Sequence, residues 1–156
     1  MSLRYYVETE TQEDTGMEQP DSAELKTGKL TTEQLDLLLT HLPVDVSFVD
    51  ADGFVRYYSD TPSRIFKRSP AIIGRHVEKC HPAKSVDKVK KIVSAFAAGE
   101  KDTAQFWIEL GGKFTHIRYF AVRDEMGKFV GTLEVSQDVT EIRKLEGECR
   151  LLDWED

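Results

Sequence analysis

The sequence predicts an α+β fold, in which one five-stranded antiparallel sheet carries short helices and one longer helix on one face. Three observations favour this fold. Two strand-like runs joined by an Asp-Gly turn come first, a long amphipathic helix follows, and three alternating runs separated by Gly-containing turns come last. Strand pairs on either side of a helical middle are typical of a single sheet with helices packed on it.

Length and composition bound the class of protein. With 156 residues, 40% hydrophobic content and 10% aromatic content, the chain suits one globular domain. Its apolar runs are too short to cross a bilayer, and no signal-peptide pattern opens it. Its two cysteines, Cys80 and Cys149, are too few for a disulfide scaffold. This favours a reducing, cytoplasmic location.

The acidic charge of the chain is concentrated near its start. Residues 8–24 hold seven acids and no Lys or Arg, and the remaining residues hold 21 acids against 21 bases. Such a polar stretch buries too little surface to offset its ordering entropy, so residues 1–24 are predicted to be a flexible tail or linker. Because there is no basic field and no basic amphipathic helix, we expect neither a nucleic-acid nor a membrane partner.

The first half of the folded part, from residue 25, begins with a helix. Thr31 and Gln34 resemble a capping box, Pro43 ends the helix, and one side is apolar through Leu35, Leu38, Leu39 and Leu42. Alternating residues around Asp52 and Gly53 then predict a β-hairpin over 44–58. Residues 61–74 are interrupted by Pro and Gly, which predicts short helical turns.

The second half contains the best helix and three strands. Ser85 is predicted to cap a helix that ends at Gly99 and has one apolar stripe of Val86, Val89, Ile92, Val93 and Phe96. Strands are predicted at 104–110, 114–123 and 129–137. The middle strand is bulky on both faces, which is typical of a strand inside a sheet covered on both sides. An exit helix is predicted from Asp138, with residues 146–156 as its end and tail.

This order of elements resembles a PAS domain over roughly residues 30–145. The ending Gly131…Asp138-Val139-Thr140 is similar to the Gly…Asp-Ile-Thr ending of that family. A narrower resemblance is to the subgroup found C-terminal to hemerythrin-like HHE domains in bacterial and archaeal proteins of unknown function. It is carried by residues 42–50, 73–85, 106–108, 117–124, 131–135 and 145–147. The subgroup usually has Cys-His-Pro-Pro-Lys-Ser, where this chain has Ala83 in place of the second Pro.

The resemblance implies a sensory or regulatory domain rather than an enzyme. It implies that residues 25–145 bind a small ligand or cofactor and relay its state to an attached domain, as a homodimer, with a hemerythrin-like domain upstream. The main alternative is a ligand-free module for dimerisation or protein interaction. An enzyme is the third reading, with His116, Glu109 and Glu134 as an imaginable acid–base set. No P-loop, dinucleotide or nucleophile-elbow motif supports it.

The predicted site lies around residues 73–85, because PAS pockets lie between the sheet and the short helices. The candidate ligand-binding residues are His76, Cys80, His81, Phe66, Trp107 and Tyr119. His81 is a candidate haem ligand, Cys80 a candidate redox thiol, and His76, Cys80 and His81 together a weak zinc set. The plainer interpretation is a loop whose histidine packs on the sheet while Pro82 sets the chain direction.

Overall fold

The computed structural model describes residues 21–151, which divide into two compact units, one ending at Leu35 and the other beginning at Asp36. Most of the predicted acidic tail lies outside the described residues. Its last part does not: Ser22, Ala23 and Glu24 belong to a strand. The boundary predicted at residue 24 is corrected accordingly.

The first unit contains a small hairpin that the sequence did not predict. Strand β1 (Ser22–Leu25) pairs antiparallel with β2 (Gly28–Thr31). Helix α1 (Thr32–His41) follows directly and continues into the second unit. The predicted capping box is confirmed, because Gln34 N donates to Thr31 Oγ1 at 3.1 Å and Thr31 N donates to Gln34 Oε1 at 2.9 Å. No residue of α1 is buried.

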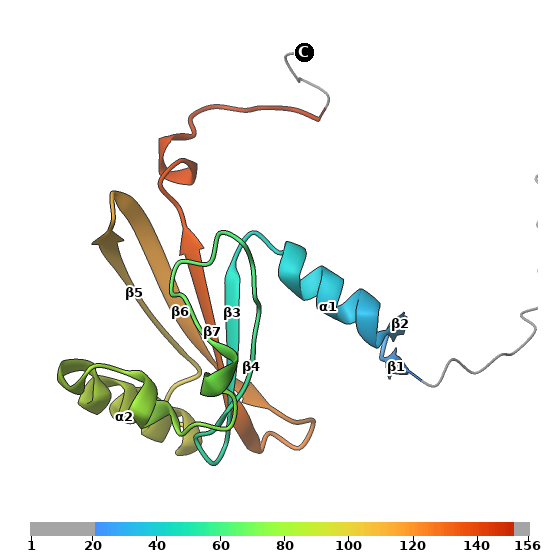
Figure 1. The fold of residues 1–156 in the computed structure, drawn as a ribbon, viewed down its shortest axis with the longest axis vertical. Helices are drawn as coiled ribbons and strands as arrows, with labels where there is room; N and C mark the ends of the chain where they lie inside the picture. Colours follow the sequence, from blue (N-terminus) through green and yellow to red (C-terminus); the bar gives the residue numbers. More distant parts are fainter. Residues whose placement is uncertain (1–20, 152–156) are drawn as a thin grey trace, which may run out of the picture. The chain divides into compact units, whose positions relative to one another are not determined.

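The second unit is built on the predicted five-stranded antiparallel sheet (Figure 1). Its strands lie in the order β4-β3-β7-β6-β5. They are β3 (Asp45–Asp50), β4 (Val55–Tyr58), β5 (Thr103–Leu110), β6 (Lys113–Arg123) and β7 (Phe129–Asp138). The last strand of the chain is therefore the central one. At Gly131 of β7 a Cβ atom would lie 2.3 Å from Val49 O, so only glycine fits this close approach to β3.

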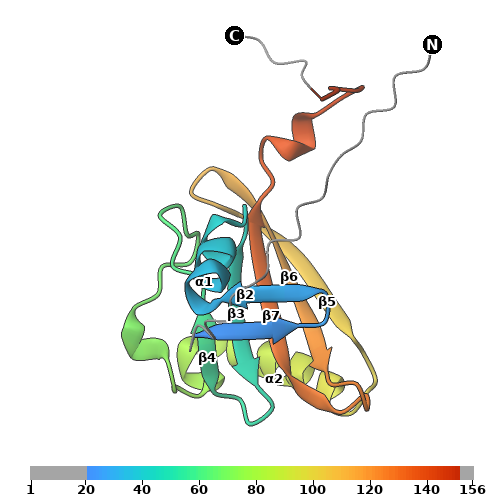
Figure 2. The same cartoon turned by 90° about the vertical axis from the view of Figure 1, so that its right-hand side faces the viewer.

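The pairing register of the strands shows which side chains share each face of the sheet. Tyr119 of β6 is paired with both Ala104 and Glu134, so these three side chains share one face. Helix α2 (Ala83–Ala97) covers this inner face (Figures 1 and 2). Its Phe96 is fully buried against Ile117 and Tyr119. The predicted long helix and its apolar stripe are thus confirmed, and the inner face is now identified. The predicted N-cap is wrong: the helix begins at Ala83 after Pro82, and Ser85 lies in its first turn, where its hydroxyl donates to Pro82 O at 3.0 Å.

An arginine holds the loop that follows β4. Arg64 is buried, and its guanidinium donates to Ser59 O at 2.6 Å, to Ser47 Oγ at 2.8 Å and to Phe66 O at 3.0 Å. On the same loop, Thr61 Oγ1 and Ile65 N donate to the buried carboxylate of Asp45. These bonds fix residues 59–66 against the inner face of β3.

Two short 3₁₀ helices connect this loop to α2. They are η1 (Pro70–Ile72) and η2 (Val77–Cys80). The prediction of short helical turns over 61–74 is correct only in part, because residues 61–69 form no helix. Between the two 3₁₀ helices, the chain pairs with the start of β4 through Gly74 N to Val55 O at 2.8 Å and Val55 N to Arg75 O at 3.0 Å.

The predicted exit helix is wrong within the described residues. After β7 only the short 3₁₀ helix η3 (Ile142–Lys144) forms, and residues 145–151 have no regular helix. Leu145 and Leu151, two apolar residues of this segment, are 77% and 88% exposed. A short helix is marginal in water unless its apolar side packs on a surface.

Candidate functional site

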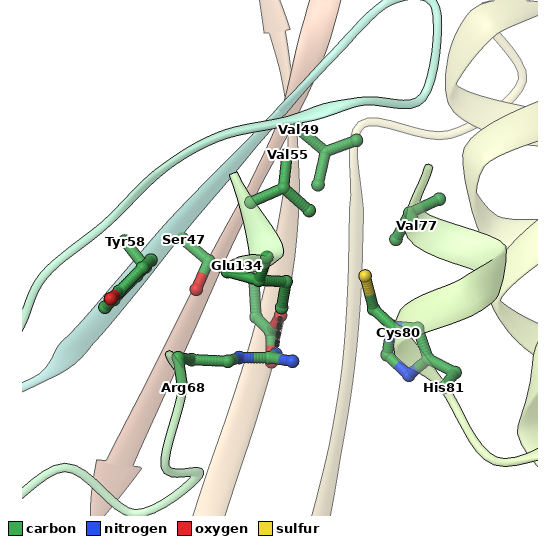
Figure 3. A pocket seen from close by; sticks show the side chains of 10 residues that line it. Ser47, Val49, Val55, Tyr58, Arg68, Val77, Cys80, His81 and Glu134 are labelled. Atoms are coloured by element: carbon green, nitrogen blue, oxygen red, sulfur yellow. Dashed lines mark ion pairs between the residues drawn. The ribbon is translucent and has the colours of Figure 1, made fainter. Parts of the chain in front are cut away.

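A small cavity lies where β3, β4 and β7 meet the segment from Arg68 to His81 (Figure 3). Its volume is about 20 Å³, which is room for about one water molecule. Four of the lining residues are apolar (Val49, Val55, Ile72 and Val77), and six carry polar groups (Ser47, Tyr58, Arg68, Cys80, His81 and Glu134). The cavity is thus a meeting point of polar side chains inside the domain.

An ion pair borders the cavity. Arg68 Nη2 lies 3.7 Å from Glu134 Oε2, and the two side chains are 15% and 16% exposed. This separation exceeds the 2.7–3.2 Å of a normal N–H···O hydrogen bond, so the two groups attract each other without a direct hydrogen bond. Glu134 comes from the central strand, whereas Arg68 comes from the irregular segment before η1.

Burial dominates the protonation of Glu134. Desolvation raises the pKa of its carboxyl group, while Arg68, Arg64 and the hydroxyl of Ser136 lower it, and Asp45 raises it slightly. The buried Tyr119 hydroxyl lies in the same field, and its pKa is raised by burial and by Glu134. Glu134 therefore holds a proton more readily than an exposed carboxyl group does.

Cys80 and His81, two of the predicted residues, do line the cavity. Burial raises the pKa of the Cys80 thiol, whose Sγ lies 3.6 Å from His76 O. Burial, and next the charge of Arg68, lower the pKa of His81. Both groups are consequently held neutral near pH 7. A reactive thiolate is favoured by the opposite shift, so the redox interpretation of Cys80 gains no support from this environment.

The structure places the other four predicted residues elsewhere. Tyr119 is buried in the core, with Phe66 packed beside it. His76 contacts Phe54 edge to face and borders a separate surface hollow of about 280 Å³ next to α2. Trp107 is 60% exposed, and its pairing with His116 puts both on the outer face of the sheet. None of the four lines the cavity, and their roles in ligand binding stay predictions.

The cofactor and catalytic alternatives were tested against this geometry. Ligand pockets usually measure about 300–1,000 Å³, so a cavity of about 20 Å³ does not fit haem, although His81 borders it. His76, Cys80 and His81 do not form a metal-binding group, and the described residues contain no cluster of three or more such side chains. His116 bonds to Gln105 on the outer face while Glu134 is on the inner face, so the imagined acid–base set does not assemble.

Sequence reasoning missed the charged pair that marks the site. The arginines of β6 do not contribute to it: Arg123 pairs with Asp102, and Arg118 bonds weakly to Gln137. One signal was available: the polar residues Thr132, Glu134 and Ser136 alternate along β7 and so share one face of the sheet. No local pattern pointed to Arg68.

The chain leaves the sheet through a second polar cluster. Thr140 Oγ1 accepts from Phe114 N at 2.8 Å and donates to Asp138 Oδ1 at 2.5 Å, and Lys113 pairs with Asp138 at 3.2 Å. The guanidinium of Arg143 lies 3.7 Å from the centre of the Phe114 ring. The start of the exit segment is thereby attached to the first residues of β6.

Replacing Glu134 by Gln tests the charge state of the site. Because the folded-state pKa of Glu134 is raised above its ordinary value of 4.5, its ionisation costs stability. That cost is absent below pH 4.5 and grows as the pH rises through the folded pKa. We expect the free energy of unfolding of the wild type, minus that of Glu134→Gln, to fall with rising pH, measured by urea denaturation at a series of pH values.

The companion variant Arg68→Gln removes the cation that opposes this shift. When Arg68→Gln is present in both proteins, the free energy of unfolding of the protein with Glu134, minus that of the Glu134→Gln variant, is expected to fall more steeply with pH than when Arg68 is present. A difference that rises with pH would mean that pairing with Arg68 outweighs burial, and would contradict the assignment.

The second unit is an α+β domain with a five-stranded antiparallel sheet, short helices and a small polar cavity. Residues 35–140 match the profile of the PAS domain family, and the chain belongs to that family. PAS domains are generally sensory rather than catalytic. The described residues include no helix long and apolar enough to span a bilayer.

Solved structures agree with this assignment. A C-terminal domain from Streptococcus mutans is 39% identical, with a TM-score of 0.74, over 80% of this chain and 97% of that one. The PAS domain of BvgS from Bordetella pertussis is 18% identical (TM-score 0.53; 72% of this chain and 91% of that one). A PAS domain from Colwellia psychrerythraea is 17% identical (TM-score 0.52; 70% and 97%). The last two show the fold alone. Comparison with curated proteins gave no match.

Proposed function

We propose that this PAS domain is a sensor that binds a small polar ligand at the cavity beside Arg68 and Glu134 and relays its binding to the exit segment. The observation that carries the proposal is the largely buried ion pair bordering the cavity, whose side chains are 15% and 16% exposed. Burying two charges costs several kcal/mol of desolvation, and apolar residues of similar size often stabilise a core as well or better. Charges retained at a cavity are better explained by recognition than by packing.

The relay would run along β7. Glu134 and Asp138 are four residues apart on this central strand and share its inner face. At about 3.4 Å per residue they are separated by about 13 Å along the strand. Asp138 accepts from Thr140, which in turn binds the backbone of Phe114. A shift of β7 at the cavity would therefore reach the first residues of the exit segment.

The proposal is tested with the full chain and a panel of common amino acids, carboxylates, amines and nucleobases at millimolar concentration. We expect at least one compound to raise the Tm, because binding to the native state alone stabilises it. The same compound should change amide hydrogen exchange in residues 138–151. Thr140→Val removes the hydroxyl that binds Phe114 N, and is expected to keep the rise in Tm but lose the exchange response.

Thr140→Ser keeps the hydroxyl and serves as the matched control. If no compound raises the Tm, ligand binding is refuted. If the Thr140→Val protein keeps the full exchange response, the route through Asp138 and Thr140 is refuted.

The small cavity favours a second candidate function, a ligand-free interaction module. Room for about one water is what a packed core contains. Exposed apolar side chains on β5 and α1, among them Trp107 and Leu38, give such a module surface for a partner. The Tm panel separates the two functions, because a module without a ligand site responds to no compound.

We also infer that the domain acts as a homodimer in the cytoplasm, downstream of a hemerythrin-like domain. The dimer is supported by the unburied apolar side of α1 and by the exposed aromatic side chains of β5. The upstream domain and the location rest on the resemblance described above and on the cysteine content. Sedimentation of the full chain at several concentrations tests the dimer; a monomer at all of them would refute it.

A further inference from the structure

We infer that the ligand class of this cavity is a small aliphatic zwitterion of the amino-acid type, whose carboxylate pairs with Arg68 and whose ammonium group pairs with Glu134. The inference rests on the proposed function and names the chemistry of the same site. It follows from three properties of the described residues: the charge balance of the interior, the gap within the ion pair, and the apolar residues among those that line the cavity.

The interior charges around the cavity cancel. Arg64 and Arg68 are opposed by Asp45 and Glu134, the four groups that interact electrostatically around Glu134. Cys80 and His81 are held neutral, as described above. A purely anionic ligand would take Arg68 and leave Glu134 either charged without a partner or protonated, and a purely cationic ligand would take Glu134 and leave Arg68 charged without a partner. Either outcome is costly. A zwitterion replaces one ion pair by two and keeps the balance.

The geometry leaves room for this exchange. The 3.7 Å separation of Arg68 Nη2 and Glu134 Oε2 means that neither group gives up a direct hydrogen bond when the ligand enters. Glu134 is fixed on the central strand. Residues 67 and 68 connect the loop held by Arg64 to the first turn of η1. Within the described part of the chain they make no backbone hydrogen bond. Arg68 is therefore the side of the pair that moves.

The apolar lining of the cavity selects the rest of the ligand. Val49, Val55, Ile72 and Val77 are among the lining residues, and the three valines lie close to the polar groups (Figure 3), so a short aliphatic side chain would replace water beside them. A cavity of about 20 Å³ is smaller than such a ligand. Binding consequently selects an opened state of the 67–69 segment, and the apparent affinity is reduced by the population of that state.

The test compares L-valine with its two half-molecules on the wild-type chain by calorimetry. Isovalerate is valine without the ammonium group, and isobutylamine is valine without the carboxylate. Loss of one partner of a buried charge pair costs about 2 kcal/mol or more, so each half-molecule should bind about thirtyfold more weakly than L-valine. This comparison needs no variant and does not depend on how a substitution affects folding.

Variants of Glu134 and Arg68 should change which of the three compounds binds best. A purely structural role of these two residues would not produce such a change. In Glu134→Gln the ammonium group loses its partner while Arg68 keeps its charge, so the preference should shift from L-valine towards isovalerate. Arg68→Gln should shift it towards isobutylamine. The controls are Arg75→Gln, at an exposed arginine of the following segment, and Glu78→Gln, in a surface pair with Lys90. Both should keep the wild-type order.

The outcomes separate this inference from the proposed function. Tight binding of L-valine with weak binding of both half-molecules supports the zwitterion. If isovalerate, isobutylamine or an uncharged panel compound binds the wild type as well as or better than L-valine, the zwitterion is overturned while a ligand site remains. If no compound in the panel binds, both the zwitterion inference and the proposed sensor function are refuted.

Discussion

Replacing Arg64 by alanine is expected to lower the free energy of unfolding by about 3–5 kcal/mol, the range for removing one member of a buried charged network. The guanidinium supplies hydrogen bonds to Ser59, Ser47 and Phe66. Without it, those acceptors lose their partner in the interior, and the buried carboxylate of Asp45 loses its compensating charge. Urea denaturation followed by circular dichroism measures the loss.

Arg56→Ala is the matched control. Arg56 pairs with Asp50, but its side chain is 56% exposed, so its removal should cost about 0–1 kcal/mol. Arg64→Lys should fall between the two, since it keeps the charge but cannot form the forked set of bonds. A cost below about 1 kcal/mol for Arg64→Ala would show that the loop over residues 59–66 is held by other contacts.

Replacing Phe96 by alanine is expected to cost about 3–5 kcal/mol, the range for deleting a fully buried aromatic side chain. Phe96 is the one large hydrophobic side chain with no exposure among the described residues, and it joins α2 to Ile117 and Tyr119 of β6. Alanine is the best helix former, so the loss reports packing rather than helix propensity.

Phe96→Leu fills more of the site and should cost clearly less, while Ser94→Ala, at an exposed position of the same helix, should be close to neutral. Equal losses for Phe96→Leu and Phe96→Ala would mean that ring shape rather than volume decides the packing of α2.

Regular elements of the second unit were predictable because their signals are local. The turn at Asp52 and Gly53, the alternation along 104–110 and the apolar stripe of α2 each lie within one short window, and each is confirmed. The hairpin over residues 22–31 escaped because its two four-residue strands are too short to show a pattern. The exit helix was overpredicted because apolar spacing alone cannot say whether a surface exists to bury it.

Of the candidate site, the sequence indicated a segment rather than a contact. Cys80 and His81 line the cavity, because the segment that the resemblance singled out lies beside the sheet, and their role in ligand binding stays a prediction. The pair Arg68–Glu134 joins residues 66 positions apart, and it exists only through the strand order that brings β7 next to β3. Neither periodicity nor a motif encodes such a contact. The contact follows from the strand order of the folded sheet, which no single short stretch of the sequence specifies.

The polar inner face of the sheet also affects how the domain responds to temperature. Asp45, Ser47, Thr115, Thr132 and Ser136 are buried there in positions that are usually aliphatic. Exposing polar surface on unfolding lowers the heat capacity change, whereas exposing apolar surface raises it. The heat capacity change on unfolding is therefore smaller than it would be with aliphatic residues at these five positions, and the curve of stability against temperature is correspondingly flatter.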